Sequence, residues 1–386
     1  MIELVIIGIY ILAGVSGLLI FLLLFKIIRD KMMQYKDEIL KKELKEKLNH
    51  YLAGTDDLNL SLSRRKKRLL QEIIMNYLKQ VKGETKQQLR NFAAKCGIID
   101  FKIEQLINSN QWWRKSEAAY TLGELGATEA IEPLVDYLDD NNSDIRYQSA
   151  LALVKISDEQ NLALVITKLL EFDFYPQEVI LRLIEEVEAD IYEVMLPLIS
   201  SQELEKRVIA LRSLGLKQDY NVLAWIKKYL KSETVNLVVA SLKAAYQLGD
   251  IGDEDYFELL LESKDSSSPQ VRANLAQVLE KFRTKRSRNE LQRLMTDPYW
   301  KVRYNAAQSL LAHGAEGIIA LSQQLESTDK FAQDMAWQIL HKEIIFNNLF
   351  DSNDFEDYDS LLNNIRDYLI ETDKEGVLNE LENYFN

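Results

Sequence analysis

The sequence is poor in the residues that interrupt helices and in the residue that cross-links chains. Its 386 residues include five prolines, fourteen glycines and a single cysteine, Cys96. The scarcity of proline and glycine, with Leu, Ile, Ala, Glu and Lys recurring at helical spacing, predicts an all-α protein. One cysteine excludes a disulfide within the chain, which fits a reducing compartment.

The sequence also lacks the residue patterns of common catalytic and metal sites. The three histidines, His50, His313 and His341, are too far apart for the usual spacing of zinc ligands. The glycines of the stretch 123–126 lack the Lys-Ser/Thr of a phosphate loop and are better explained as a helix end. The acidic stretch 250–255 reads as helix capping rather than ion binding. We therefore expect no enzyme, no cofactor and no metal.

A long uncharged segment stands near the amino terminus. Leu4–Phe25 contains no charged residue, and Lys26, Arg29 and Lys31 follow it directly. A helix of this length reaches roughly 33 Å, which is enough to cross a bilayer core. Residues 1–25 are therefore predicted to be a transmembrane anchor. Because positive residues stay inside, we expect a single pass of the cell membrane with the amino terminus outside and the rest in the cytoplasm.

The formal net charge of −13 is unevenly distributed. Between Lys26 and Arg90 there are 17 Lys and Arg against 9 Asp and Glu, and residues 26–92 are predicted to form basic juxtamembrane helices. The first helix, 26–51, continues the anchor, and Ser61 or Ser63 caps a second one. That second helix begins with the basic run Arg64, Arg65, Lys66, Lys67 and Arg68.

Cations are unfavourable at a helix amino terminus, so this first basic run needs another explanation. Contact with anionic lipid headgroups is the leading candidate, since each Lys or Arg near such a surface contributes about 1 kcal/mol. A solvated topological signal and nucleic-acid contact are the alternatives.

From residue 111 onward the sequence repeats itself. Arg272 and Arg303 lie 31 residues apart, as do Ser241 and Arg272, and each is followed by small and apolar residues at matching offsets. The pattern Trp112, Lys115, Ala118, Ala119 and Leu122 returns as Trp300, Arg303, Ala306, Ala307 and Leu310. Each unit continues into a second apolar helix. Because one such pair cannot bury its apolar face alone, the repeats predict a stacked α-solenoid.

The stretch Asp297-Pro298-Tyr299-Trp300-Lys301-Val302-Arg303 followed by Ala306-Ala307, and the segment Trp113 to Leu138, resemble the HEAT repeat family in the short form also found in phycobilisome lyases. The resemblance covers residues 93–342. It implies a superhelical scaffold or adaptor with a concave surface for a protein partner. Membrane-anchored bacterial proteins of this kind resemble accessory proteins of membrane glycosyltransferases and signalling assemblies.

Two other functions follow from the same resemblance. A bilin-lyase-like enzyme is one, but the match lies in structural positions rather than in pocket chemistry. A HEAT-like nucleic-acid-binding protein is the other, as in alkylpurine DNA glycosylases. Negative net charge and a membrane tether argue against nucleic acid as a partner.

Aspartates precede the recurrent arginines at near-constant distance. Asp140 lies six residues before Arg146, and Asp297 lies six residues before Arg303. In HEAT-like arrays such residues form a ladder between adjacent units, and we expect one here, with the arginines structural rather than ligand-binding.

The repeats carry a second basic run without acidic residues. Its partner-docking candidates are Arg283, Lys285, Arg286 and Arg288, and the alternative is a solvated turn. Residues 343–386 are acidic, with 2 Lys and Arg against 11 Asp and Glu from Asp351 onward, and contain scattered aromatics. We expect them to form capping helices for the last repeat, with partner docking as the alternative.

Overall fold

A computed structural model describes residues 2–54, 62–171, 175–187, 190–347 and 358–372. Within these ranges all regular secondary structure is helical, which confirms the predicted all-α class. The chain divides into two compact units, Met1–Phe172 and Asp173–Asn386.

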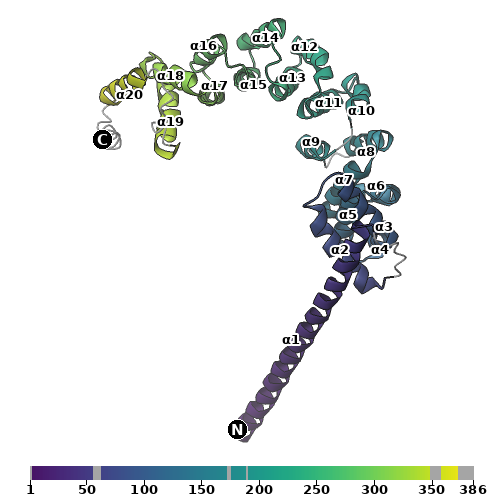
Figure 1. The fold of residues 1–386 in the computed structure, drawn as a ribbon. Helices are drawn as coiled ribbons and strands as arrows, with labels where there is room; N and C mark the ends of the chain where they lie inside the picture. The colour runs from purple at the N-terminus through teal and green to yellow at the C-terminus, as the bar shows by residue number, and fades with distance from the viewer. Residues whose placement is uncertain (1, 55–61, 172–174, 188–189, 348–357, 373–386) are drawn as a thin grey trace. The chain divides into compact units, whose positions relative to one another are not determined.

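The first unit begins with one long helix, α1, which runs from Ile2 to Leu52 without a break (Figure 1). The predicted helix over 26–51 is therefore continuous with the preceding segment. Leu44 and Leu48 of α1 are fully buried against the helices that follow, whereas the apolar side chains from Leu18 to Ile28 are more than half exposed. The carboxyl-terminal end of α1 thus belongs to the core of the first unit.

Among the side chains that the structure describes, none of the helices combines the length and apolar character needed to cross a bilayer. On α1 this description covers Gly14 and the residues from Ser16 onward. The structure therefore gives the predicted span over Leu4–Phe25 no support.

The rest of the first unit is a stack of short helices. Contacts between α5 and α7 dominate it, and α4 packs on α5. Gly123 lies inside α5, and a Cβ there would stand 2.7 Å from the Ala152 Cα, so close packing requires this glycine. Gly126, in the left-handed conformation, ends the helix. The elements are α2 (Arg64–Leu78), α3 (Glu84–Lys95), α4 (Ile98–Asn108), α5 (Trp112–Leu125), η1 (Thr128–Ala130), α6 (Ile131–Asp136), η2 (Tyr137–Asp139), α7 (Ser143–Ile156) and α8 (Glu159–Glu171).

The second unit is an array of helix pairs in two rows (Figure 1). In one row α11, α13, α15 and α17 pack successively. Helices of the other row pack on them: α10 on α11, α12 on α13, and α16 and α18 on α17. The elements are α9 (Gln177–Glu185), α10 (Tyr192–Ile199), α11 (Leu204–Leu216), η3 (Tyr220–Val222), α12 (Leu223–Leu230), α13 (Val235–Leu248), α14 (Glu254–Leu261), η4 (Glu262–Asp265), α15 (Pro269–Leu279), α16 (Lys285–Leu294), α17 (Trp300–Ala312), α18 (Ala315–Gln323), η5 (Gln324–Glu326), α19 (Lys330–Asn347) and α20 (Tyr358–Glu371).

Small residues at the recurring positions bring neighbouring helices together. A Cβ on Gly215 of α11 would lie 2.6 Å from the Ala244 Cα of α13, so only glycine allows this approach. Ala306 and Ala307 are likewise fully buried in α17. The predicted stacking of repeats on small residues is thus confirmed at the level of atoms.

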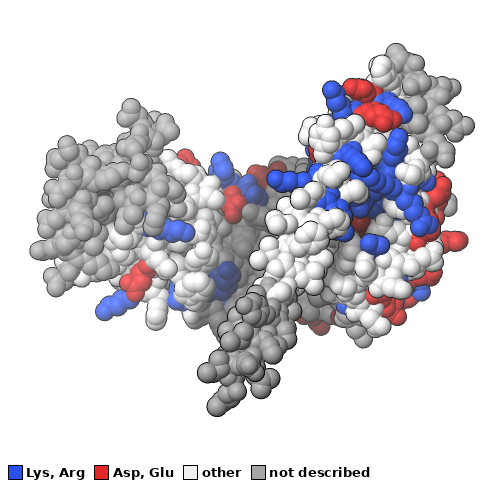
Figure 2. All heavy atoms as spheres, turned by 90° about the horizontal axis from the view of Figure 1, so that it is seen from below, with Lys and Arg blue, Asp and Glu red and all other residues white. Residues whose placement is uncertain are grey.

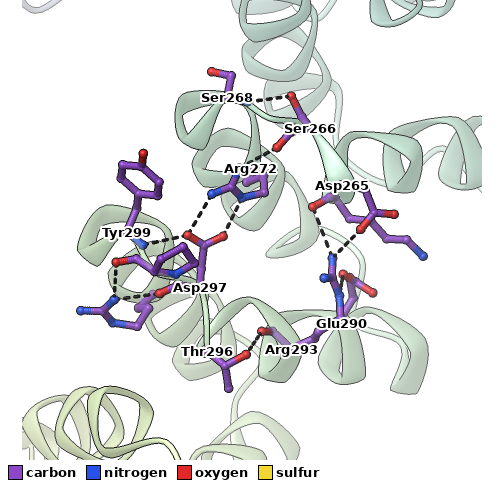
Figure 3. A network of polar contacts seen from close by, with 12 residues as sticks. Asp265, Ser266, Ser268, Arg272, Glu290, Arg293, Thr296, Asp297 and Tyr299 are labelled. Carbon is purple, nitrogen blue, oxygen red and sulfur yellow. Dashed lines mark hydrogen bonds and ion pairs between the residues drawn. The ribbon is translucent and has the colours of Figure 1, made fainter.

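The recurrent arginines bind backbone carbonyls of the loop before their own helix, as Figure 3 shows for Arg272. Arg146 donates to the Asp140 carbonyl at 2.8 Å, and Arg303 donates to the Asp297 carbonyl at 2.7 Å. Arg272 also donates to both carboxylate oxygens of Asp297, at 2.6 and 3.0 Å. Arg272 thus makes the expected ladder contact between adjacent units, whereas the backbone contacts of Arg146 and Arg303 anchor the loop that begins their own helix.

The last described helix, α20, packs on α18 and η5. Its Tyr368 is buried and lies against Trp337 with ring centroids 5.5 Å apart. This packing fits the predicted cap over the last repeat. The stretches 348–357 and 373–386 of the acidic end lie outside the described residues.

Candidate functional site

The first basic run lies in the first turns of α2, where the sequence placed it. Ser63 is the N-cap, and its hydroxyl accepts a hydrogen bond from the Lys66 backbone N–H. The run therefore meets the positive end of the helix dipole, which is unfavourable unless partners compensate.

Three of its side chains find those partners in neighbouring elements. Arg65 Nε donates to Asp37 of α1 at 2.8 Å, and Lys66 Nζ lies 3.5 Å from Glu43 of the same helix. Lys67 donates to the Gly97 carbonyl at 2.9 Å. These contacts hold α2 against α1 and against the start of α4. They supply a structural reason for cations at this helix start.

The two remaining arginines of the run, Arg64 and Arg68, line an open groove. Arg64 is exposed and pairs with Glu104 of α4 at 2.6 Å, whereas the Arg68 guanidinium makes no hydrogen bond or ion pair with any described residue. The groove has a volume of about 950 Å³. Its lining comes from α1, α2, α4, α5 and the α4–α5 loop, with Met33, Phe101, Trp113 and Arg114 among the contributors.

A buried polar network forms the floor of this groove. Lys102 is only 1% exposed, and its ammonium donates to Glu117 at 3.1 Å and to Gln105 at 3.3 Å. Glu117 also accepts hydrogen bonds from Gln71 and Gln105. Burial lowers the pKa of Lys102, and the Glu117 carboxylate opposes that shift. The Lys102–Glu117 pair of the floor thus has no net charge, and several hydrogen bonds hold it in place.

The walls of the groove carry an excess of positive charge. Five cationic side chains line it against two carboxylates, Glu104 and Glu117, and each of these carboxylates is already paired. Arg114 is exposed, lies over the Trp113 ring at 5.0 Å, and has no carboxylate partner among the described residues. Figure 2 shows Lys and Arg side chains gathered beside α1 on this face. Arg68 and Arg114 are therefore available to an anionic group.

The second basic run splits into paired and unpaired residues. Arg286 of α16 pairs with Glu258 and, at 3.0 Å, with Glu254, both on α14. Arg288 pairs with Glu316 of α18 at 2.5 Å. These two arginines link successive helices of one row, a role that the sequence did not reveal.

The other two candidates of the second run remain accessible. Arg283 and Lys285 are exposed, and none of the described residues offers their charged ends a hydrogen bond or an ion pair. Within the predicted docking patch, these two residues are the ones that contacts between the repeat helices do not use.

Sequence reasoning missed the groove because α4 and α5 contribute half of it. Lys102, Arg114 and Trp113 follow no motif, and only the packing of α4 on α5 and α2 brings them near Arg68. The acidic stretch before α14 behaves as predicted, since Asp253 caps that helix by accepting from the Tyr256 N–H. Across the described part of the chain, no cluster of His, Cys, Asp and Glu has the arrangement of a metal site.

Successive helix pairs stacked through small residues, with hydrogen bonds repeated from pair to pair, define an α-solenoid repeat protein. The family model for HEAT repeats matches residues 99–174 and 257–339. These two segments thus match HEAT repeats, as the sequence resemblance indicated. No curated protein matches it.

Several solved structures are similar to the chain at low identity. An engineered protein is 18% identical and covers 85% of this chain and 98% of its own, with a TM-score of 0.36. Human deoxyhypusine hydroxylase in complex with glycerol is 14% identical, with 79% and 96% covered and a TM-score of 0.27. The complex of CpcE and CpcF of phycocyanin lyase from Nostoc sp. PCC7120 is 17% identical, with 63% and 94% covered and a TM-score of 0.31.

Proposed function

We propose that this protein is a non-enzymatic, membrane-anchored adaptor whose HEAT repeats bind and regulate a partner protein in the cytoplasm. A membrane glycosyltransferase or a signalling assembly is the kind of partner that the family resemblance favours. Repeat arrays expose long surfaces on rigid helix pairs, which suits them to protein binding. Nucleic acid is not part of the proposal, because the chain carries a net charge of −13.

One observation carries the membrane part of the proposal. The large apolar side chains of α1 from Leu18 to Phe25 are each at least half exposed, and no described part of the protein covers them. They continue the uncharged run that begins at Leu4. A soluble helix would bury such a stripe, so lipid is the environment that removes it from water. The same unbroken helix then enters the first repeat unit through Leu44 and Leu48.

The groove beside α1 supports contact with anionic headgroups. Met33 of α1 lines it, eight residues beyond Phe25, which is roughly 12 Å along a helix. Headgroup regions occupy several ångströms beyond each side of the hydrocarbon core. We therefore expect the long side chains of Arg68 and Arg114 to reach phosphates of the inner leaflet.

Extraction and co-purification test the adaptor proposal. The full chain should stay in the membrane pellet after high-salt and alkaline washes, and protease added to intact cells should leave the repeats uncut. Purification from native membranes in mild detergent should recover one partner in near-stoichiometric amount. Release by salt, digestion of the repeats from outside, or recovery of the protein alone would each contradict the proposal.

Reconstitution tests the headgroup contact separately. The full chain in nanodiscs with phosphatidylglycerol should melt at a higher temperature than in phosphatidylcholine alone, because a ligand of the folded state stabilises it. Combining Arg68→Glu with Arg114→Glu should remove that difference. Lys79→Glu with Lys82→Glu, at the opposite end of α2, makes the same charge change and should preserve it. Equal melting in both lipids would rule out the contact.

A further inference from the structure

A row of polar side chains crosses the exposed face of three successive repeat helices in the second unit. Glu203, Thr234 and Ser268 are the N-caps of α11, α13 and α15. Arg212, Lys243 and Gln277 each lie nine residues after the cap of their own helix. The repeat geometry therefore brings them to the same level of adjacent helices, although they are far apart in the sequence.

A small cleft lies along this row. Its volume is about 110 Å³, and its lining residues come from α11, α13 and α15 alone. Ligand and cofactor pockets usually measure about 300–1,000 Å³, so this cleft suits a single polar group rather than a cofactor. Apart from Leu216 and Leu242 the lining is polar: Arg212, Lys243, Tyr246, Gln247, Asn274 and Gln277.

The charge in the cleft is positive and incompletely compensated. Arg212 donates to both oxygens of Glu178, at 2.8 and 3.1 Å, and is thereby fixed in place. Lys243 has no carboxylate within ion-pair distance among the described residues. Partial burial, followed by repulsion from Arg212, lowers the pKa of Lys243, and Glu178 only partly offsets these effects. A carboxylate brought to Lys243 would relieve this repulsion.

Uncharged donors flank the cation. Asn274 uses its amide N–H to bind the Gln270 carbonyl of its own helix at 2.8 Å. The amide groups of Gln247 and Gln277 make no hydrogen bond within the described structure, and Gln277 is exposed. They can donate to the second oxygen of a carboxylate or to the backbone of an extended segment. The carboxylate of the nearby Glu280 is already occupied, because it accepts hydrogen bonds from Tyr246 and Lys281.

We propose that the cleft over α11, α13 and α15 binds a carboxylate side chain of an acidic, extended segment of the partner protein. Lys243 supplies the charge, Gln247 and Gln277 orient the segment, and Arg212 holds the edge of the site. Helices pack about 8–10 Å apart, so the first and third axes lie roughly 16–20 Å apart, and an extended segment of about six residues crosses all three. This inference rests on the adaptor function and names the chemistry of its partner.

Peptide binding to the purified full chain tests the proposal independently of membranes and of partner capture. The probes are two fluorescein-labelled decapeptides, one alternating Glu and Ser and the other alternating Lys and Ser. Fluorescence anisotropy at low salt should show binding of the Glu peptide and at least about tenfold weaker binding of the Lys peptide, since complementary charge sets specificity. A Lys peptide bound as well as the Glu peptide would overturn the proposal, as would no Glu-peptide binding up to about 1 mM.

Variants locate the site. Lys243→Glu should weaken binding of the Glu peptide at least about tenfold, and the neutral Lys243→Gln should weaken it to a lesser degree. Lys231→Glu makes the same charge change at an exposed lysine after α12 and should alter binding by less than about twofold. Thermal melting should be unchanged in all three, because both lysines are exposed. Equal binding by wild type and Lys243→Glu, or equal losses at both positions, would refute this location.

Discussion

Arg272 of α15 grips both carboxylate oxygens of Asp297, which lies 25 residues later in the loop before α17 (Figure 3). The side chains are 12% and 7% exposed, and Asp297 also accepts from the Tyr299 N–H at 2.9 Å. One carboxylate therefore joins one repeat to the next and starts the following helix.

Replacing this carboxylate should weaken the repeat junction. We expect Asp297→Asn to lower the free energy of unfolding by about 2 kcal/mol, because the largely buried Arg272 charge loses its partner. Denaturant unfolding followed by circular dichroism measures it. The matched control is Asp265→Asn, which touches the exposed pair between Arg293 and Asp265 at 3.7 Å and should cost less than about 1 kcal/mol. Equal losses would contradict the assignment.

The same junction should depend on pH. Burial alone raises the pKa of Asp297, but the hydrogen bonds from Arg272 and the Tyr299 N–H outweigh it and hold the pKa below its ordinary value. A lowered folded-state pKa gives stability that is present above about pH 4 and is lost as the pH falls through the folded value. The stability difference between wild type and Asp297→Asn should therefore be full at pH 7 and shrink at about pH 3. A difference constant over this range would be inconsistent with this linkage.

Close packing of α11 on α13 should not tolerate a methyl group. Gly215→Ala would place a Cβ 2.6 Å from the Ala244 Cα, and separating the two backbones should cost about 1–3 kcal/mol of stability. The unfolding midpoint in denaturant reports this loss. Gly17→Ala is the control, because a Cβ there meets nothing within 4 Å. An unchanged midpoint for Gly215→Ala would show that the helices can separate freely.

The single thiol should be a probe of unfolding. Cys96 is buried, and burial raises its pKa to about 11, with the Lys67 charge acting weakly in the opposite direction. The reactive thiolate is then a small fraction at pH 8, so the native protein should react with an aromatic disulfide reagent at least about 100-fold slower than a free thiol. Addition of denaturant should restore the full rate. Rapid labelling of the native protein would mean that the site opens frequently.

The second basic run should separate binding from stability. Arg283→Glu with Lys285→Glu should reduce recovery of the co-purified partner and leave the unfolding midpoint unchanged, since neither side chain has a described ion-pair partner. Arg286→Glu should instead lower the unfolding midpoint slightly, because it loses Glu254 and Glu258. Undiminished recovery with the double variant would exclude this patch as a docking site.

The sequence predicted what depends on local periodicity. The small residues of α17 and a serine cap for α2, which is Ser63 of the two candidates, follow from residue chemistry, and the structure confirms both. The 31-residue step holds from α11 to α13 and from α15 to α17, but α13 starts at Val235 and α15 at Pro269, so the predicted equivalence of Ser241 and Arg272 is wrong. The partners of long side chains are different, because they lie on other elements. Nothing near Arg65 in sequence indicates Asp37 of α1, 28 residues earlier, as its partner.

The surfaces with the most chemistry were also the least predictable. The groove of the first unit and the Arg212–Lys243–Gln277 row both arise from helix stacking, because each is lined by a few residues from each of three or more helices. The row was detectable in principle, since its members share their distance from a helix cap. Finding it required the helix starts, and these depend on capping geometry that the sequence leaves open by a residue or two.

The continuity of α1 has a mechanical consequence for an adaptor at a membrane. From Lys26 to Leu52 the helix has no hinge, and this length corresponds to roughly 40 Å of stiff rod. Under the proposed anchoring, such a tether would fix both the height and the rotational setting of the first repeats above the lipid. Binding partners would then be sampled within a narrow shell at that height, rather than throughout the volume that a flexible linker of equal length would sweep.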